Sequence, residues 1–151
     1  MKITICGSIA FIDEMNEAAE LLTQHGHEVK APPVFVRDHE GQKFSVKEFY
    51  ALRRRCPDDA WVWDEKKDAM IGHFEKVAWA DAILVLNEDK NGIAGYVGAN
   101  TLMEMGLALY LKKPIYLLHE VPELSYKEEI LGMQPILLEG SLERLYAKEL
   151  A

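Results

Sequence analysis

The sequence has few cysteines, no long apolar run and no excess of positive charge, and each shortage excludes a class of protein. The two cysteines, Cys6 and Cys56, lie in an apolar and a basic segment, so we expect neither a disulfide framework nor a CxxC metal site. No stretch approaches the roughly 20 apolar residues that a membrane helix needs. The net charge of -8 disfavours nucleic acid polymers and anionic membranes as partners, because both bind basic surfaces.

Targeting and cofactor motifs are also missing. The apolar run in the opening MKITICGS is too short for the central region of a signal peptide, so we expect a cytoplasmic protein. HExxH, P-loop and GxGxxG motifs are absent, and carboxylates do not gather at metal-ligand spacing. We therefore predict no metal and no cofactor. A small anionic ligand remains compatible with this acidic chain, because a single pocket can be positive.

The patterns that are present predict one α/β domain over residues 1–151. Apolar or β-branched runs predict strands at 2–7, 27–31, 82–86, 114–118 and 136–138. Apolar residues at helical spacing predict helices at 12–22, 64–80, 101–111 and 125–131, and from Ser141 onward. Strand–helix–strand order implies parallel strands joined by right-handed crossovers. We therefore expect a doubly wound, Rossmann-like sheet of about five parallel strands with helices on both faces.

Residues 33–63 break this alternation and are the least regular part of the sequence. They hold three arginines at 53–55 and the triplet Trp-Val-Trp at 61–63, and a short helix is expected near 45–55. Segments of this length in compact domains are often lids or binding loops. The arginines could neutralise a phosphate and the tryptophans could stack on a base, although a solvated basic face and half-buried aromatic residues are the simpler interpretations.

Glu104 is the strongest candidate for chemistry, because almost all of its neighbours between Thr101 and Ala108 are apolar. A carboxylate there is costly to bury unless it is paired or reactive. Thr101-x-x-Glu104 also matches a capping box, in which Glu104 would reach back to a backbone N–H, and the two alternatives stay open. Gly106 favours the alternative in which Glu104 is reactive. A glycine inside a helix lowers helix stability by up to about 1 kcal/mol relative to alanine, and it usually allows the close approach of another group.

Three segments resemble the nucleoside 2-deoxyribosyltransferase superfamily. Residues 98–108 are similar to its Gly-Thr-x-x-Glu-x-Gly-x-Ala stretch, and Lys113-Pro114 to the Lys-Pro that opens its next strand. Residues 80–86 match the Ala-Asp strand that comes before, and residues 3–9 resemble the first strand and sugar-phosphate loop of the nucleotide N-hydrolase branch. The segments occur in the correct order and spacing, within 1–31 and 64–118.

The resemblance implies that Glu104 is a nucleophile, which attacks the anomeric carbon of a nucleoside or nucleotide and forms a glycosyl-enzyme intermediate. It also implies a homodimer and a sugar bound between two turns, one after each of the strands at 2–7 and 82–86. Open parallel sheets bind ligands at such turns, although each alone is also an ordinary tight turn. The implied substrate-binding residues are Gly7, Ser8, Ile9, Ala10, Tyr96, Gly98, Asn100 and Thr101.

The sequence departs from the superfamily's pattern at three positions. His73 stands eight residues before Asp81, where an acidic residue usually helps the leaving base or the sugar, and a histidine can act as general acid or base there. Gly98 stands where transferases carry Asp and nucleotide hydrolases tend to carry Ser, and Asn100 replaces a glycine. Backbone N–H donors at the two turns favour a 5′-phosphate, but the missing serine hydroxyl weakens this preference.

We therefore expect an N-glycosidase that hydrolyses nucleoside 5′-monophosphates or nucleosides, with Glu104 and His73 as catalytic residues. The alternatives are a deoxyribosyltransferase and a non-catalytic nucleotide-binding module. Transferases of the superfamily line their site with the C-terminal segment of a neighbouring subunit, and residues 146–151 do not reproduce that segment. This difference favours hydrolysis over transfer.

Overall fold

The structure, a computed structural model, describes residues 1–38, 40–58 and 61–150, with side chains up to residue 146. Its centre is a sheet of five parallel strands in the order β2-β1-β5-β6-β7. The strands are β1 (Lys2–Cys6), β2 (Glu28–Lys30), β5 (Ala82–Val85), β6 (Ile115–Leu117) and β7 (Ile136–Leu137). The strand order reverses between β1 and β5, and ligands of such sheets bind at this point. The predicted parallel sheet is confirmed.

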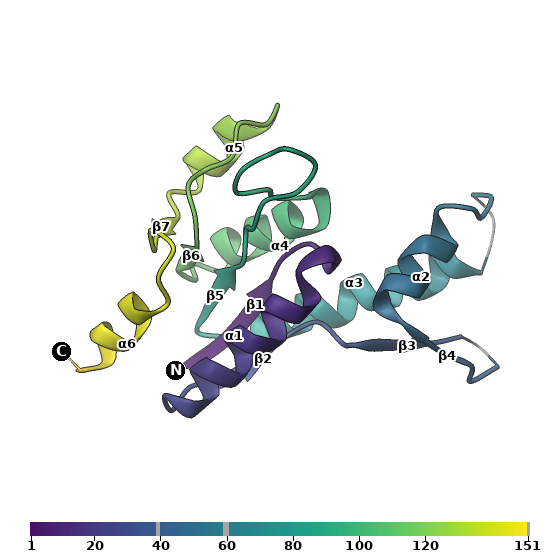
Figure 1. The fold of residues 1–151 in the computed structure, drawn as a ribbon, viewed down its shortest axis with the longest axis horizontal. Coiled ribbons are helices and arrows are strands. Elements are labelled where there is room, and N and C mark those ends of the chain that lie inside the picture. Colours follow the sequence, from purple (N-terminus) through teal and green to yellow (C-terminus); the bar gives the residue numbers. More distant parts are fainter. Residues whose placement is uncertain (39, 59–60, 151) are drawn as a thin grey trace.

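Helices cover both faces of the sheet (Figure 1). One face carries α1 (Ile12–Gln24), which follows the 3-10 turn η1 (Ile9–Phe11), and α6 (Glu143–Leu150). The other face carries α3 (Val62–Trp79), α4 (Ala99–Tyr110) and α5 (Lys127–Gly132). The doubly wound architecture is therefore confirmed. None of the described helices combines the length and apolar character that crossing a membrane requires.

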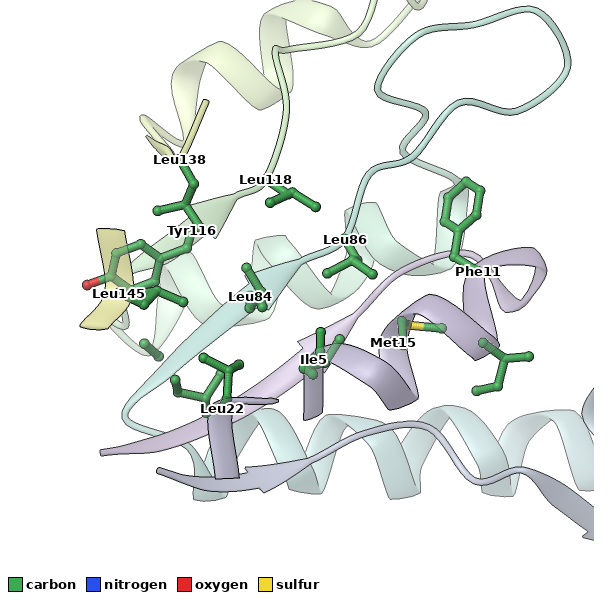
Figure 2. Close-up of a cluster of buried hydrophobic side chains, with 14 of the residues drawn as sticks. Ile5, Phe11, Met15, Leu22, Leu84, Leu86, Tyr116, Leu118, Leu138 and Leu145 are labelled. Atoms are coloured by element: carbon green, nitrogen blue, oxygen red, sulfur yellow. The ribbon is translucent and has the colours of Figure 1, made fainter. Parts of the chain in front are cut away.

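Each face has its own core, because neighbouring residues of a strand point to opposite sides of the sheet. Ile3 and Ile5 of β1 pack on the α1 side, where Figure 2 shows Ile5 among Met15 and Leu84. Cys6 packs on the opposite side with residues of α3 and α4. The alternation in β1 thus places a thiol under the two helices that carry His73 and Glu104.

The described residues between 33 and 61 form a hairpin and a helix that lie away from the sheet (Figure 1). The elements are β3 (Phe35–Arg37), β4 (Lys43–Ser45) and α2 (Val46–Arg53), and the two strands are antiparallel. The helix confirms the prediction near 45–55, and Ser45 Oγ caps it by accepting a hydrogen bond from the backbone N–H of Glu48 at 3.1 Å. The sequence does not predict the hairpin, because strands of three residues show too little alternation.

The C-terminal end of α3 is fixed to the sheet by side chains of other elements. Lys113 Nζ donates to the carbonyls of Val77, at 3.1 Å, and of Ala78 at the end of the helix, where positive charge is favourable. Thr4 of β1 donates from Oγ1 to the carbonyl of Lys76 at 2.7 Å. These contacts hold the preceding turn of α3, including His73, at a defined distance from β1.

Asn87 holds the loop between β5 and α4. Its buried side chain donates to the carbonyls of Gly95 (3.2 Å) and Glu120 (3.0 Å) and accepts from the backbone N–H of His119 (2.9 Å). Gly95 has a φ of +66°, and a Cβ there would lie 2.7 Å from the Glu120 carbonyl oxygen, so only glycine fits. The loop therefore delivers Tyr96 and the start of α4 in a defined position.

Candidate active site

Glu104 is a buried carboxyl in the middle of α4. The buried residues of this helix recur at the spacing of one helical face: Thr101, Glu104, Met105 and Ala108. Because Glu104 lies on this face, it is only 7% exposed. Its Oε2 forms no hydrogen bond with any residue that the structure describes.

The capping-box interpretation of this helix is wrong, and the interpretation of Gly106 is not met within the described residues. The helix begins at Ala99 with Gly98 at its N-cap, so Thr101 and Glu104 are not placed as a capping box. A Cβ at Gly106 would have no atom of another described element within 4 Å, so this glycine does not serve a close approach within the chain. A capping role therefore does not explain the buried carboxyl.

Glu104 lies beside His73 and Cys6. His73 Nε2 is 3.3 Å from Glu104 Oε2 and 3.5 Å from Cys6 Sγ, at the end of β1. The thiol, imidazole and carboxylate ligand atoms all lie within 4.8 Å of one another. The structure thus brings together the two residues that the sequence proposes as catalytic. It adds Cys6, which the sequence analysis does not single out.

Burial controls the protonation of these three groups. Burial, partly offset by the Lys66 ammonium, raises the pKa of Glu104 to about 8. Burial and, to a smaller extent, the charge of Lys76 lower the pKa of His73 to about 4. Burial, together with the Glu104 carboxylate, raises the pKa of the Cys6 thiol. At neutral pH the imidazole and the thiol are therefore neutral.

Glu104 and His73 line a pocket of about 420 Å³, beyond the carboxyl ends of β1 and β5. Seven of the eight predicted substrate-binding residues also line it: Gly7, Ser8, Ile9, Tyr96, Gly98, Asn100 and Thr101. The exception is Ala10, which lines a second, acidic hollow instead. The 3-10 turn η1 separates successive side chains by about a third of a turn, so Ile9 and Ala10 face different sides.

Two further walls of the pocket consist mostly of residues that the sequence analysis does not single out. One is a face of α3, made of Lys66, Ala69, Met70, His73 and Phe74. These residues follow helical spacing, so counting backwards from His73 by three, four and seven would have found this face. The other wall comes from the 33–63 segment and consists of Val36, Val46, Phe49, Tyr50 and Arg53.

Ser8, Lys90 and Tyr96 form a polar end of the pocket. Lys90 Nζ donates to Ser8 Oγ at 2.9 Å and lies 5.0 Å from the centre of the Tyr96 ring. Ser8 Oγ also accepts a hydrogen bond from the backbone N–H of Ala10 at 3.3 Å. A Cβ at Gly98 would lie 3.5 Å from the Tyr96 hydroxyl oxygen. The tyrosine hydroxyl therefore lies close to the position of the serine that this chain lacks.

The functions suggested for the arginines at 53–55 and for the tryptophans of the 61–63 triplet are only partly supported by the structure. Of the arginines at 53–55, only Arg53 lines the pocket. Neither Trp61 nor Trp63 is among its lining residues, so base stacking by a tryptophan is wrong for this structure. Trp61 instead packs near Phe49, with ring centres 6.2 Å apart, and thereby supports the pocket wall from behind.

Comparison with known proteins gives likeness in structure but not in sequence. The chain matches no protein-family model and no curated protein by sequence. Its structure is similar to that of the CMP N-glycosidase BcmB of Clostridium botulinum, with a TM-score of 0.51 and 15% identity over 99% of this chain and 98% of the other. A 2-deoxyribosyltransferase from Bacillus psychrosaccharolyticus gives a TM-score of 0.48 and 18% identity, over 77% of this chain and 70% of the other.

The likeness to the N-glycosidase concerns the fold. It extends over nearly the whole of both chains, and the match includes the segment 33–63 within its span. The chain therefore has the fold of this N-glycosidase, with a sheet of five parallel strands between helices.

Proposed function

We propose that the protein is an N-glycosidase that hydrolyses the base–sugar bond of nucleoside 5′-monophosphates. The observation that carries this proposal is Glu104, a carboxyl that is 7% exposed, lines a pocket and forms no hydrogen bond from Oε2 to the described residues. A buried carboxyl without such a partner is costly and is typical of sites where chemistry needs it. The fold of a CMP N-glycosidase supports the same class of reaction.

Glu104 acts first in the proposed reaction. Its ionised carboxylate attacks the anomeric carbon while the C–N bond breaks, and the base leaves with the bonding electron pair and takes a proton from solvent. The product is a glycosyl ester of Glu104. Water then attacks the same carbon, which releases the sugar phosphate and returns the carboxylate.

His73 acts in the second step as the base that takes a proton from the attacking water. Burial lowers the pKa of this imidazole to about 4, so at neutral pH the ring is neutral and acts as a weak base, which takes the proton while the water attacks and then passes it to solvent. Its Nε2 lies 3.3 Å from the carboxylate oxygen of Glu104, and therefore close to the carbon that the water must reach.

The polar end of the pocket suits the 5′-phosphate. Lys90 and Ser8 offer an ammonium group and a hydroxyl, and Arg53 and Lys66 add positive charge to the lining. On a chain of net charge -8, such a local group of cations favours an anionic substrate. The apolar side chains of the 33–63 wall suit the flat face of a base.

A nucleoside monophosphate should bind more tightly than its nucleoside by more than about tenfold, since a charge-assisted hydrogen bond contributes about 1.5–3 kcal/mol. Lys90→Ala and Ser8→Ala should each narrow this ratio, because they weaken only the phosphate contact. Calorimetry on the Glu104→Gln background would give both dissociation constants without turnover. Arg55→Ala removes a positive charge outside the pocket lining and should leave the ratio unchanged. Equal affinity of the Glu104→Gln protein, without further substitutions, for the nucleoside and its monophosphate would refute the phosphate contact.

The value of kcat/KM should rise with pH and level off above pH 8. Glu104 must be ionised to attack, and its pKa is raised to about 8, so each pH unit below that value lowers the reactive fraction about tenfold. The groups facing the carboxyl are His73, Cys6 and Lys66. Lys66→Gln removes a charge that lowers the pKa of Glu104, so the profile should move to higher pH. Initial rates in chelating buffers at a series of pH values give this profile. A value of kcat/KM that does not change with pH would contradict the requirement for an ionised Glu104.

Incubation with a panel of nucleosides and monophosphates, followed by chromatography of the free base, tests the proposed activity. Adding a second base to the same mixtures separates hydrolysis from transfer. A sugar phosphate as the product indicates the hydrolase, whereas a new nucleoside indicates the transferase. Binding of monophosphates without any release of base would identify a binding module.

We also propose that the protein forms a homodimer. The helix α4 leaves large apolar side chains exposed, namely Met103, Leu109 and Tyr110, and a second copy could cover them. Sedimentation velocity over a range of concentrations tests this, and a monomer throughout would contradict it.

A cytoplasmic location stays a prediction from the sequence.

A further inference from the structure

Cys6, His73 and Glu104 form a set of ligands for a transition metal, and we propose that they bind one Zn²⁺ ion that blocks the active site. A thiolate, an imidazole and a carboxylate are the three kinds of side chain that zinc prefers. Three protein ligands with a fourth position open to a pocket are the arrangement of accessible zinc sites. Binding of the ion depends on these residues alone, and only its inhibitory effect rests on the proposed function.

The distances between the ligand atoms match a tetrahedral zinc site. With a Zn–S bond of about 2.3 Å and Zn–N and Zn–O bonds of about 2.0–2.1 Å, tetrahedral angles require about 3.6 Å between S and N and about 3.4 Å between N and O. Cys6 Sγ and His73 Nε2 are 3.5 Å apart, and His73 Nε2 and Glu104 Oε2 are 3.3 Å apart. The remaining distance, from the thiol to the carboxylate, is at most 4.8 Å, and rotation within the glutamate side chain can shorten it.

The surroundings also favour a cation at this point. Glu104 Oε2 is buried and forms no hydrogen bond with the described residues, so an ion would satisfy an otherwise costly group. His73 and Glu104 line the pocket, and the fully buried Cys6 lies behind them. An ion that enters through the pocket therefore meets all three ligands and keeps its fourth position for a water molecule. Binding releases the thiol proton to solvent, since the thiolate is the form that binds zinc.

Zinc in this position would block base release. The ion occupies the Glu104 oxygen lone pair that attacks the anomeric carbon, and the His73 lone pair that accepts the proton from water. Added Zn²⁺ should therefore inhibit the enzyme, and a chelator should restore or leave unchanged its activity. The prediction that the reaction needs no metal is consistent with this role.

Titration of the protein with Zn²⁺ alone, measured by calorimetry, should give a stoichiometry of one ion per chain. Titration with Co²⁺ alone should give the intense visible bands of a tetrahedral site together with a thiolate-to-cobalt charge-transfer band. Cys6→Ser should lose the charge-transfer band and weaken zinc binding by at least about tenfold, because a hydroxyl is a poor ligand for this metal. Cys56→Ser, the same change at the other cysteine, is the matched control and should bind as the wild type does.

Each outcome decides the proposal. Unchanged zinc affinity in Cys6→Ser, or a cobalt complex of the wild type without a thiolate band, would overturn it and would place the ion elsewhere, for example at His119 and Glu88. The cobalt spectrum of the wild type keeps the test valid even if the Cys6 variant does not fold. Because both measurements need no substrate, the zinc site can fail while the proposed hydrolysis holds, and the reverse.

Discussion

Glu104→Gln should lower the rate of base release by at least about 10³-fold while the protein remains folded. The amide keeps the size and shape of the carboxyl group but cannot attack the anomeric carbon. The initial rate with the best monophosphate of the panel is the measurement. Glu75→Gln makes the same chemical change at an exposed position of α3 and should keep wild-type activity.

The same substitution should not destabilise the protein at pH 8. Burial raises the pKa of Glu104 from 4.5 to about 8. Between these two pH values the folded state therefore holds a proton that the unfolded state has released, and the free energy of unfolding falls as the pH rises. Glutamine has no such proton, so the urea midpoint of the variant should equal or exceed that of the wild type. A glutamate that only stabilised the helix would behave oppositely, with a loss of about 0.5–2 kcal/mol and near-wild-type turnover.

His73→Ala should slow steady-state turnover by about 10²- to 10⁴-fold and yet leave the first turnover fast. Glu104 would still be glycosylated, but water would then have no base to activate it. The release of base should therefore show a burst of one equivalent per site followed by a slow phase. Rapid quenching at comparable concentrations of enzyme and substrate measures both phases.

A histidine that only shaped the pocket would slow the first turnover as much as the later ones. The absence of a burst in His73→Ala would thus contradict the assignment of His73 as the base. His119→Ala is the matched control, because this imidazole contacts Glu88 at 3.1 Å and does not line the pocket. It should keep wild-type kinetics in both phases.

The parallel sheet could be predicted from the sequence, since buried strands of such sheets are continuous apolar runs. The strand β5 (Ala82–Val85) is buried at every position, and its predicted range of 82–86 differs by one residue. The hairpin of β3 and β4 could not be predicted, because each strand has only three residues. In β3 the central residue is less exposed than its two neighbours, and β4 shows no alternation. Short strands of this kind are specified by what they pack against rather than by their own pattern.

Part of the candidate site could also be read from local sequence. Glu104 stands out as a carboxyl in an apolar helix, and the glycine-containing turns mark the ends of strands. The contact between Lys90 and Ser8 could not be read in this way, because the two residues lie 82 positions apart and meet only through the loop that Asn87 holds. Cys6 is ordinary core by its neighbours in sequence, and only the packing of α3 and α4 over β1 brings it to His73.

The stereochemistry of methanolysis tests the nucleophilic role of Glu104 most directly. Two successive displacements, first by Glu104 and then by methanol, return the anomeric carbon to the β configuration of the substrate, whereas one direct displacement inverts it. The methyl glycoside is stable in configuration, and the anomeric signal in the proton NMR spectrum identifies it. We predict the β-methyl glycoside as the first-formed product. An α-methyl glycoside would contradict the glycosyl-enzyme intermediate on Glu104.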